Sequence, residues 1–154
     1  MYSKEEVSKQ KQAFWTAFGR YMKPVLSADG EIISWSNYKT GIPGIFFKLD
    51  AENRYVCISI LITQADPQLH AAFYECFEMQ KKMLENALGE TDWEWEQDIT
   101  DDYGKNISRI GKRVDGISIL RTEDWPALIS FLKERIVALD EYWSTAKYAF
   151  EALL

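Results

Sequence analysis

The chain has 154 residues, of which 47% are hydrophobic and 27% charged, as is typical of a single globular domain with one core. Its formal net charge of −6 argues against nucleic acid as a partner of the isolated domain, because an acidic surface repels a phosphate backbone. No apolar run is long enough to span a bilayer, and the first residues lack the hydrophobic stretch of a signal peptide, so we expect a cytoplasmic protein that binds no membrane.

The first part of the chain predicts one helix followed by three strands. The helix begins at Ser3, whose hydroxyl can form a capping box with Glu6, and it ends at Lys23-Pro24, because proline disfavours helical geometry in the residue before it. Strands are expected over residues 32–38, 45–49 and 55–63. The third strand is β-branched on one face and free of charge on the other, so we expect it inside the sheet and covered on both sides.

A second helix is predicted over residues 66–88. Asp66 can cap it, and Pro67 fits its first position, where the missing N–H of proline removes no hydrogen bond. One apolar stripe runs along this helix, and only Gln80 interrupts it.

Three more strands and a long helix are predicted for the rest of the chain. The strands are expected over residues 93–96, 106–114 and 117–120, with a tight hairpin at Asp115-Gly116. The last helix is expected from about Thr122 to Leu153. We therefore predict one α+β domain over residues 1–154, with a mainly antiparallel sheet of five to six strands and three helices in the order α-β-β-β-α-β-β-β-α.

Six segments of the chain form a recognisable pattern, and five of them carry aromatic residues at set positions. The segments are Phe14-Trp15-x-x-Phe18-Gly19, Trp35-x-Asn37-Tyr38-Lys39-Thr40-Gly41, Trp93-x-Trp95-Glu96, Ile107-Ser108-Arg109-Ile110, Asp124-Trp125-Pro126 and Asp140-x-x-Trp143. Through them the chain resembles, nearly end to end, a bacterial family known as domain of unknown function 4268. The resemblance implies no reaction. Longer members of the family place a similar domain after nuclease-like or restriction-related domains, which implies a loose link to DNA-directed defence.

A nuclease-like site is one alternative. A helix, three strands and a second helix are similar to the core of the PD-(D/E)xK nucleases, whose strands carry an acid and then an acid-x-Lys that hold Mg²⁺ and assist water attack. Asp50 could be the first acid, but no lysine in the chain has Asp or Glu two residues before it. We therefore expect no metal-dependent cleavage of DNA, and a degenerate or divergent nuclease-like domain stays an alternative.

We expect structural roles for the other residues that could bind a metal or act as a nucleophile. His70 is the only histidine, and a histidine metal site needs further ligands at set spacing, so we expect it on a helix surface. Cys57 and Cys76 lie in apolar segments without Cys-x-x-Cys spacing, so we expect small core residues. The acidic stretch over residues 92–102 lacks the spacing of a calcium-binding loop and favours a solvated or ion-paired face.

Basic residues follow this acidic stretch on the next predicted strand. If the two strands form a hairpin, one register sets Glu94 opposite Arg109 and Asp98 opposite Lys105. Cross-strand ion pairs of this kind contribute about 0.2–1 kcal/mol each. We expect pairing of Glu94 or Glu96 with Arg109 or Lys105, and an anion site at Arg109 is the alternative.

The segment around Trp35, Tyr38 and Lys39 is the best candidate for a small-ligand site, because it combines aromatic rings with hydrogen-bonding groups beside a glycine turn. The alternative is a buried Trp35 with polar neighbours. With Arg109, these residues are the candidate ligand-binding residues. We expect a non-enzymatic binding or interaction module that has a protein or small-ligand partner and no metal or cofactor.

The last helix also predicts self-association. A helix of about 45 Å would overrun a body roughly 38 Å across. Its far end carries the apolar residues Trp143, Tyr148, Phe150, Leu153 and Leu154. Either the first helix covers them or a second copy does, which would make the protein a homodimer.

Overall fold

The computed structural model of the protein describes residues 2–154, which form one four-stranded antiparallel sheet and four α-helices. In chain order the elements are α1 (Lys4–Met22), β1 (Ile45–Ala51), β2 (Tyr55–Ile62), α2 (Pro67–Met79), α3 (Lys81–Leu88), β3 (Glu94–Thr100), β4 (Asn106–Asp115), the 3-10 turn η1 (Thr122–Asp124) and α4 (Trp125–Glu151). The α+β class and the antiparallel sheet are confirmed, whereas the predicted numbers of strands and helices are wrong in detail.

The sheet has the order β1-β2-β4-β3, so β2 is an interior strand as predicted. It pairs with β1 on one side and with β4 on the other, and Ile60 lies opposite both Phe47 and Ile110. The expectation that β2 is covered on both sides is wrong, because Cys57 and Leu61, on its second face, are only half-buried. The composition therefore predicted correctly that β2 has a neighbouring strand at each edge, but it did not predict that one face of β2 would lack a covering layer.

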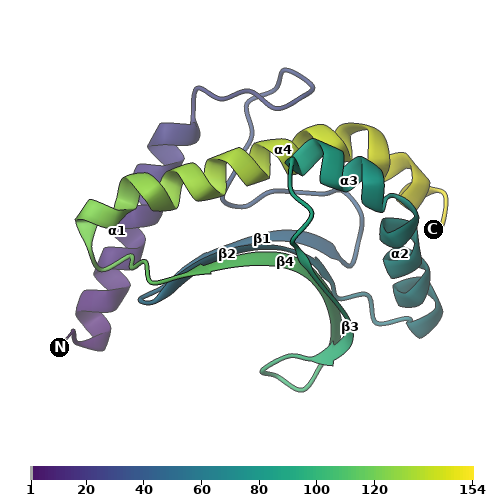
Figure 1. The fold of residues 1–154 in the computed structure, drawn as a ribbon, viewed down its shortest axis with the longest axis horizontal. Helices are drawn as coiled ribbons and strands as arrows, with labels where there is room; N and C mark the ends of the chain where they lie inside the picture. The colour runs from purple at the N-terminus through teal and green to yellow at the C-terminus, as the bar shows by residue number, and fades with distance from the viewer. Residues whose placement is uncertain (1) are drawn as a thin grey trace.

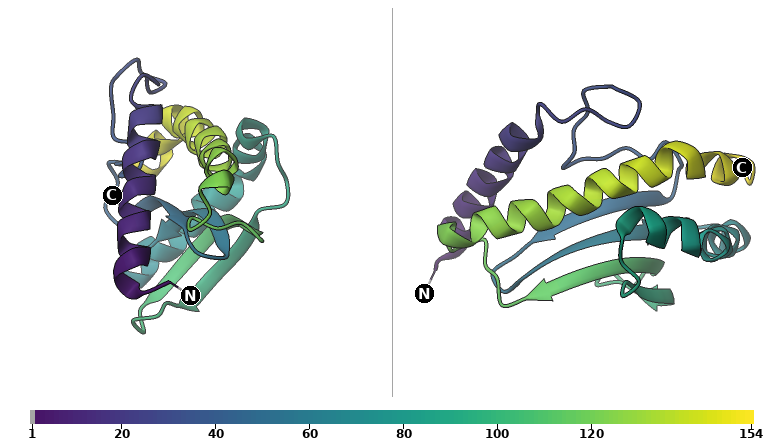
Figure 2. Two further views of the ribbon diagram at one scale, coloured as in Figure 1. Left: turned by 90° about the vertical axis from the view of Figure 1, so that its left-hand side faces the viewer. Right: turned by 45° about the horizontal axis from the view of Figure 1, so that its top comes forward.

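Helix α4 runs along one face of an arched sheet (Figure 1). Helix α1 crosses near the start of α4, while α2 and α3 lie near its other end (Figures 1 and 2). Aromatic rings join these layers: the centroids of Phe14 on α1 and Trp125 on α4 are 5.4 Å apart, and those of Phe47 on β1 and Trp143 on α4 are 5.3 Å apart. The core therefore lies between α4 and the convex face of the sheet.

The predicted helix starts are confirmed, but the second helix is broken in two. The Ser3 hydroxyl accepts from the Glu6 backbone N–H, and the Asp66 carboxylate caps α2. Gln80 leaves helical geometry and separates α2 from α3. Its side chain bonds α4 instead, since its Oε1 accepts from the hydroxyl of Tyr142. The one polar residue in the apolar stripe is thus the point at which the helix turns.

Two of the predicted strands are absent from the described part of the chain. Residues 23–44 contain no strand, and Trp35 in this segment donates its Nε1–H to the Val25 carbonyl rather than joining a ladder. Residues 117–120 do not return beside β4, because β2 and β3 already occupy both of its edges. They cross instead to the β1–β2 turn, where the Ile119 N–H donates to the Glu52 carbonyl at 3.0 Å.

Two of the five apolar residues at the far end of α4 are covered from within the chain, whereas Tyr148, Leu153 and Leu154 are exposed. Phe150 is fully buried, and its ring centroid lies 4.4 Å from that of Phe77 on α2. Trp143 is also buried, with Phe77 stacked on it at 6.1 Å. The cover comes from α2 rather than from the first helix. Self-association therefore stays a prediction, but these two rings no longer require it.

One partly buried carboxylate ties three parts of the chain together. Glu90, just after α3, accepts hydrogen bonds from Arg135 on α4, from Lys112 on β4 and from the Trp93 indole. Burial would raise the pKa of Glu90, but these donors outweigh it and lower that pKa to about 2. The carboxylate is therefore an ionised tie between the sheet and its helical layer.

Candidate binding site

The irregular segment 23–44 packs against α4 and is held there by side-chain hydrogen bonds. Asp140 on α4 accepts from the Tyr38 hydroxyl at 2.6 Å and from the Ala28 N–H at 2.7 Å. Trp143 donates its Nε1–H to the Thr40 carbonyl at 2.7 Å. Loops longer than roughly 12–15 residues without their own secondary structure are uncommon and usually functional or disordered. This one is ordered by α4.

A cleft of about 380 Å³ lies between this segment and α4. One wall is a single face of α4, at the helical spacing i, i+3, i+4, i+7, and consists of Asp140, Trp143, Ser144 and Lys147. The other wall comes from residues 27–40, including Tyr38 and Lys39. The volume falls within the roughly 300–1,000 Å³ of small-molecule sites. Both walls are rich in hydrogen-bonding groups, so the cleft suits a polar ligand.

The polar centre of the cleft is the bond between Tyr38 and Asp140. The Asp140 residue is only 6% exposed, although its carboxylate faces the cleft. Burial raises the pKa of the Tyr38 phenol, and the hydrogen bond to Asp140 raises it further. The phenol therefore stays protonated and keeps donating to the carboxylate throughout the physiological pH range.

The four candidate residues do not lie together. Tyr38 and Lys39 line the cleft, and ligand binding by them stays a prediction. Trp35 is only 3% exposed and belongs to the core, which was the alternative. Arg109 lies on β4 and binds Glu96 at 3.0 Å, as the ion-pair prediction expected. Sequence reasoning missed Asp140, whose signal was a carboxylate on the same face of the last helix as the apolar Ile136 and Trp143.

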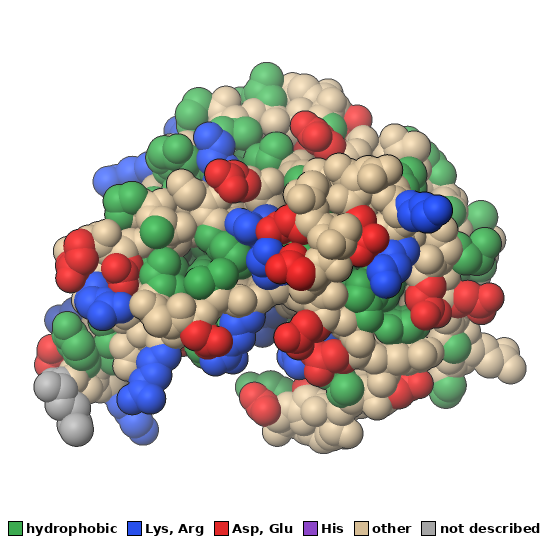
Figure 3. All heavy atoms as spheres, viewed as in Figure 1, with side chains coloured by type: hydrophobic (Ala, Val, Ile, Leu, Met, Phe, Trp, Pro, Cys, Tyr) green, Lys and Arg blue, Asp and Glu red, His purple; other side chains and the backbone are tan. Residues whose placement is uncertain are grey.

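A second surface is the face of the sheet that points away from α4, here called the open face. Along β1 the side chains alternate between buried and exposed, and Phe46 on the open face is 52% exposed. The residues of β1, β2, β4 and β3 on this face are Phe46, Lys48, Asp50, Tyr55, Cys57, Ser59, Leu61, Arg109, Gly111, Arg113, Glu94 and Glu96. Figure 3 shows a hollow at the lower edge of the molecule, with Lys and Arg side chains reaching into it. No helix of residues 2–154 covers this face (Figures 1 and 2).

Charges on the open face are balanced by pairing. Besides Arg109 and Glu96, Arg113 binds Asp115 at 2.8 Å, and Lys48 lies 3.9 Å from Asp50. The register that sets Glu94 opposite Arg109 is wrong by two residues along β3, because Glu96 lies opposite Arg109.

Burial also sets the protonation of the thiol on this face. Together with the nearby Asp50 carboxylate, it raises the pKa of Cys57 to about 11. The thiol is therefore neutral near pH 7 and a weak nucleophile.

Gly111 lies at the middle of the open face, opposite Ser59. A Cβ at this position would lie 3.1 Å from the carbonyl oxygen of Ile58 and 3.1 Å from Ser59 Cβ. A glycine inside a strand often marks a bend or a close approach of two backbones. Ser59 and Gly111 thus place no long side chain at the middle of the open face, whereas Lys48 and Glu94 lie at the two ends of the same row.

His70 is buried, so its predicted place on the helix surface is wrong. It is 2% exposed and faces the β3–β4 pair, where its Nε2 lies 2.7 Å from Ser108 Oγ. Its Nδ1 lies 3.0 Å from the Gln64 carbonyl, which can only accept, so Nδ1 carries the hydrogen and Nε2 accepts from Ser108. Ser108 also accepts from the Asp98 N–H at the β3 bulge. The His70–Ser108 pair therefore supports the bulge. Because both residues are buried, the pair does not face a substrate.

Among the residues that the structure describes, no three His, Cys, Asp or Glu side chains are grouped to hold a metal ion. None of the helices in residues 2–154 is long and apolar enough to cross a membrane. Comparison with curated proteins and with solved structures found no match. The model of one protein family, described as "Domain of unknown function (DUF4268)", matches residues 10–147, which is most of the chain. The chain therefore belongs to this family.

Proposed function

We propose that the protein is a non-catalytic binding module that docks a partner protein on the open face of its sheet. One observation carries the proposal: the α-helices of residues 2–154 all lie on one side of the sheet, and the other side is concave and presents apolar side chains to solvent. A sheet usually buries an apolar face against another layer. Here that layer would come from the partner.

The chemistry of the open face favours an amphipathic helix as the docking element. A helix with its side chains is about 10–12 Å across and is a common cover for a sheet face. The apolar side chains of Phe46 and Leu61 lie opposite each other at one end of the face. Lys48 on β1 and Arg109 and Arg113 on β4 each pair with an acidic residue, so groups of both signs lie beside these apolar side chains. A helix that carries apolar side chains on one side and charged groups of both signs at the edges of that side would complement both features.

Selection from a phage-displayed library of helical peptides tests this proposal. We expect enriched peptides that carry large apolar residues along one side of the helix, and that bind the wild type but not the Phe46→Lys variant. Tyr148→Lys is the matched control, because Tyr148 is an equally exposed aromatic residue on α4. Enriched peptides that bind Phe46→Lys as tightly as the wild type, or no enrichment at all, would refute the proposal.

The cleft between residues 27–40 and α4 supports a second candidate function, the binding of a small polar ligand. The observation that favours it is the convergence of Tyr38, Lys39 and Asp140 on one hollow. Titration with a panel of small polar metabolites, followed by intrinsic tryptophan fluorescence, would test it, because Trp143 lies in the cleft wall. Saturable changes that Tyr38→Phe weakens are expected, and a panel without any saturable change would count against this function.

The nuclease-like alternative has less support. The resemblance to nuclease cores depended on three predicted strands between the first two helices, but the structure has only two strands there, β1 and β2. Asp50, the candidate acid, lies next to Lys48 and 3.8 Å from the Cys57 thiol. Strand β2 beside it carries no acidic residue.

A further inference from the structure

A second hollow, of about 670 Å³, lies at the end of the sheet where the β1–β2 turn meets the end of β4 and the connection to η1. Three arginines from these three segments line it, namely Arg54, Arg113 and Arg121. The only acidic residue in its lining is Asp115. On a chain with a net charge of −6, this is a local excess of positive charge.

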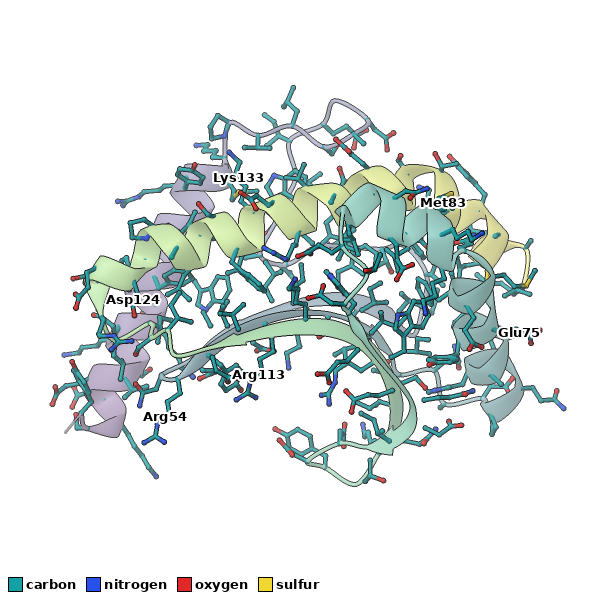
Figure 4. All side chains as sticks on the ribbon, in the orientation of Figure 1. Arg54, Glu75, Met83, Arg113, Asp124 and Lys133 are labelled. Carbon is teal, nitrogen blue, oxygen red and sulfur yellow. The ribbon has the colours of Figure 1, made fainter. Side chains whose placement is uncertain are left out.

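The three guanidinium groups differ in how far they are already paired. Arg113 uses its Nε–H on Asp115 at 2.8 Å, and its guanidinium carbon lies 3.7 Å from the centre of the Tyr55 ring. Arg121 binds Asp124 at 2.9 Å and donates from Nη2 to the Gly116 carbonyl. The Arg54 side chain makes no ion pair or hydrogen bond with other residues of 2–154. Figure 4 shows Arg54 and Arg113 projecting to the same side of the sheet, away from α4.

The backbone around the hollow is tied together, so the arginines start from fixed positions. The Gly116 N–H donates to the Arg54 carbonyl at 3.0 Å, and the Ser118 hydroxyl donates to Asn53 Oδ1 at 3.0 Å. The Ser118 N–H donates to Asp124. These bonds join the two connections that supply the arginines. The fixed backbone and the paired side chains of Arg113 and Arg121 reduce the conformational entropy lost on binding, whereas the exposed Arg54 side chain would be ordered by the ligand.

We propose that this hollow, the arginine pocket, binds a small, multiply charged phosphate compound. Guanidinium groups present planar pairs of N–H donors that match two phosphate oxygens, and arginine is over-represented at sites that recognise phosphate in this way. The pocket is larger than one phosphate group needs, which favours a ligand with more than one. The proposal goes beyond docking on the open face, because it concerns a small anion and does not need a partner protein.

Calorimetric titration of the full chain with pyrophosphate at low ionic strength tests the proposal. We expect saturable binding at one site, weakened about tenfold or more by Arg54→Gln, because each lost charge-assisted hydrogen bond has about that effect. Arg54 is exposed and unpaired within the described residues, so this variant should fold normally, which circular dichroism would check. Asp115→Asn should tighten binding, since it removes the one carboxylate of the pocket and frees Arg113.

Arg20→Gln is the matched control, since Arg20 is an exposed arginine near the end of α1 that does not line the pocket. It should leave pyrophosphate affinity unchanged. The proposal is overturned by an absence of saturable binding, by equal affinity of Arg54→Gln and wild type, or by an equal loss in Arg20→Gln. A loss of affinity in Asp115→Asn would also contradict it. Because the probe is pyrophosphate alone, failure here would leave docking of a helix on the open face untouched.

Discussion

Substitution of Glu90 by glutamine should destabilise the fold strongly, and much more than substitution of an exposed acidic residue. Its pKa of about 2 compares with an ordinary value of 4.5. One pKa unit corresponds to about 1.4 kcal/mol, so the ionised form accounts for stabilisation of the order of 3 kcal/mol. The Glu90 side chain is 18% exposed, which leaves little solvent screening, and the amide of Gln keeps one acceptor. We therefore expect Glu90→Gln to lower the free energy of unfolding at pH 7 by about 2 kcal/mol.

Urea denaturation followed by circular dichroism would measure this loss, and pH gives a second, independent check. Because folding lowers the pKa of Glu90, its contribution is complete above about pH 4.5 and is lost as the pH falls toward 2. The difference between wild type and Glu90→Gln should therefore be constant near neutral pH and shrink in acid. Glu5→Gln is the control, since its pair with Lys9 is largely exposed and should contribute little. A loss no larger than that of Glu5→Gln, or one that does not shrink in acid, would refute the reasoning.

Four further outcomes follow from the structure. Tyr38→Phe leaves the buried Asp140 with one donor fewer, so unfolding should become easier by about 1–3 kcal/mol, and amide exchange should become faster throughout residues 23–44. Gly111→Ala should lower the urea midpoint because its Cβ has no room, whereas Gly19→Ala in α1 should raise it, because a Cβ there contacts nothing and alanine favours helix. Cys57 should react with iodoacetamide more slowly than glutathione at pH 7 and should reach half of its full reactivity only near pH 11; fast labelling at neutral pH would contradict its raised pKa. The purified protein should not cut plasmid DNA with Mg²⁺ or Mn²⁺, and a nicked product that depends on the metal would disprove this.

Several features could be predicted because they depend on residues close together in the chain. Ser3 and Asp66 cap helices through bonds to N–H groups two or three residues away. The uncharged, β-branched composition of residues 55–63 was enough to place β2 inside the sheet. Alternation of acids with Trp93 and Trp95 identified β3 and suggested its ion pairing with β4.

Other features depended on distant partners. Residues 32–38 have the composition of a strand, but Trp35 donates to the Val25 carbonyl within the same segment, and Tyr38 meets Asp140 on α4 across 102 positions of the chain. Gln80 ends α2 because Tyr142 is there to donate to it. Neither partner can be recognised from the local pattern.

The sequence by itself determined the class of the fold, most helix and strand positions and two of the residues that line the cleft, since periodicity and caps are local properties of the chain. Only the tertiary structure decided the order of the strands, the open face and the grouping of Arg54, Arg113 and Arg121. These depend on which elements occupy each face and edge of the sheet, and that choice is made by burial of the whole core rather than by any one segment.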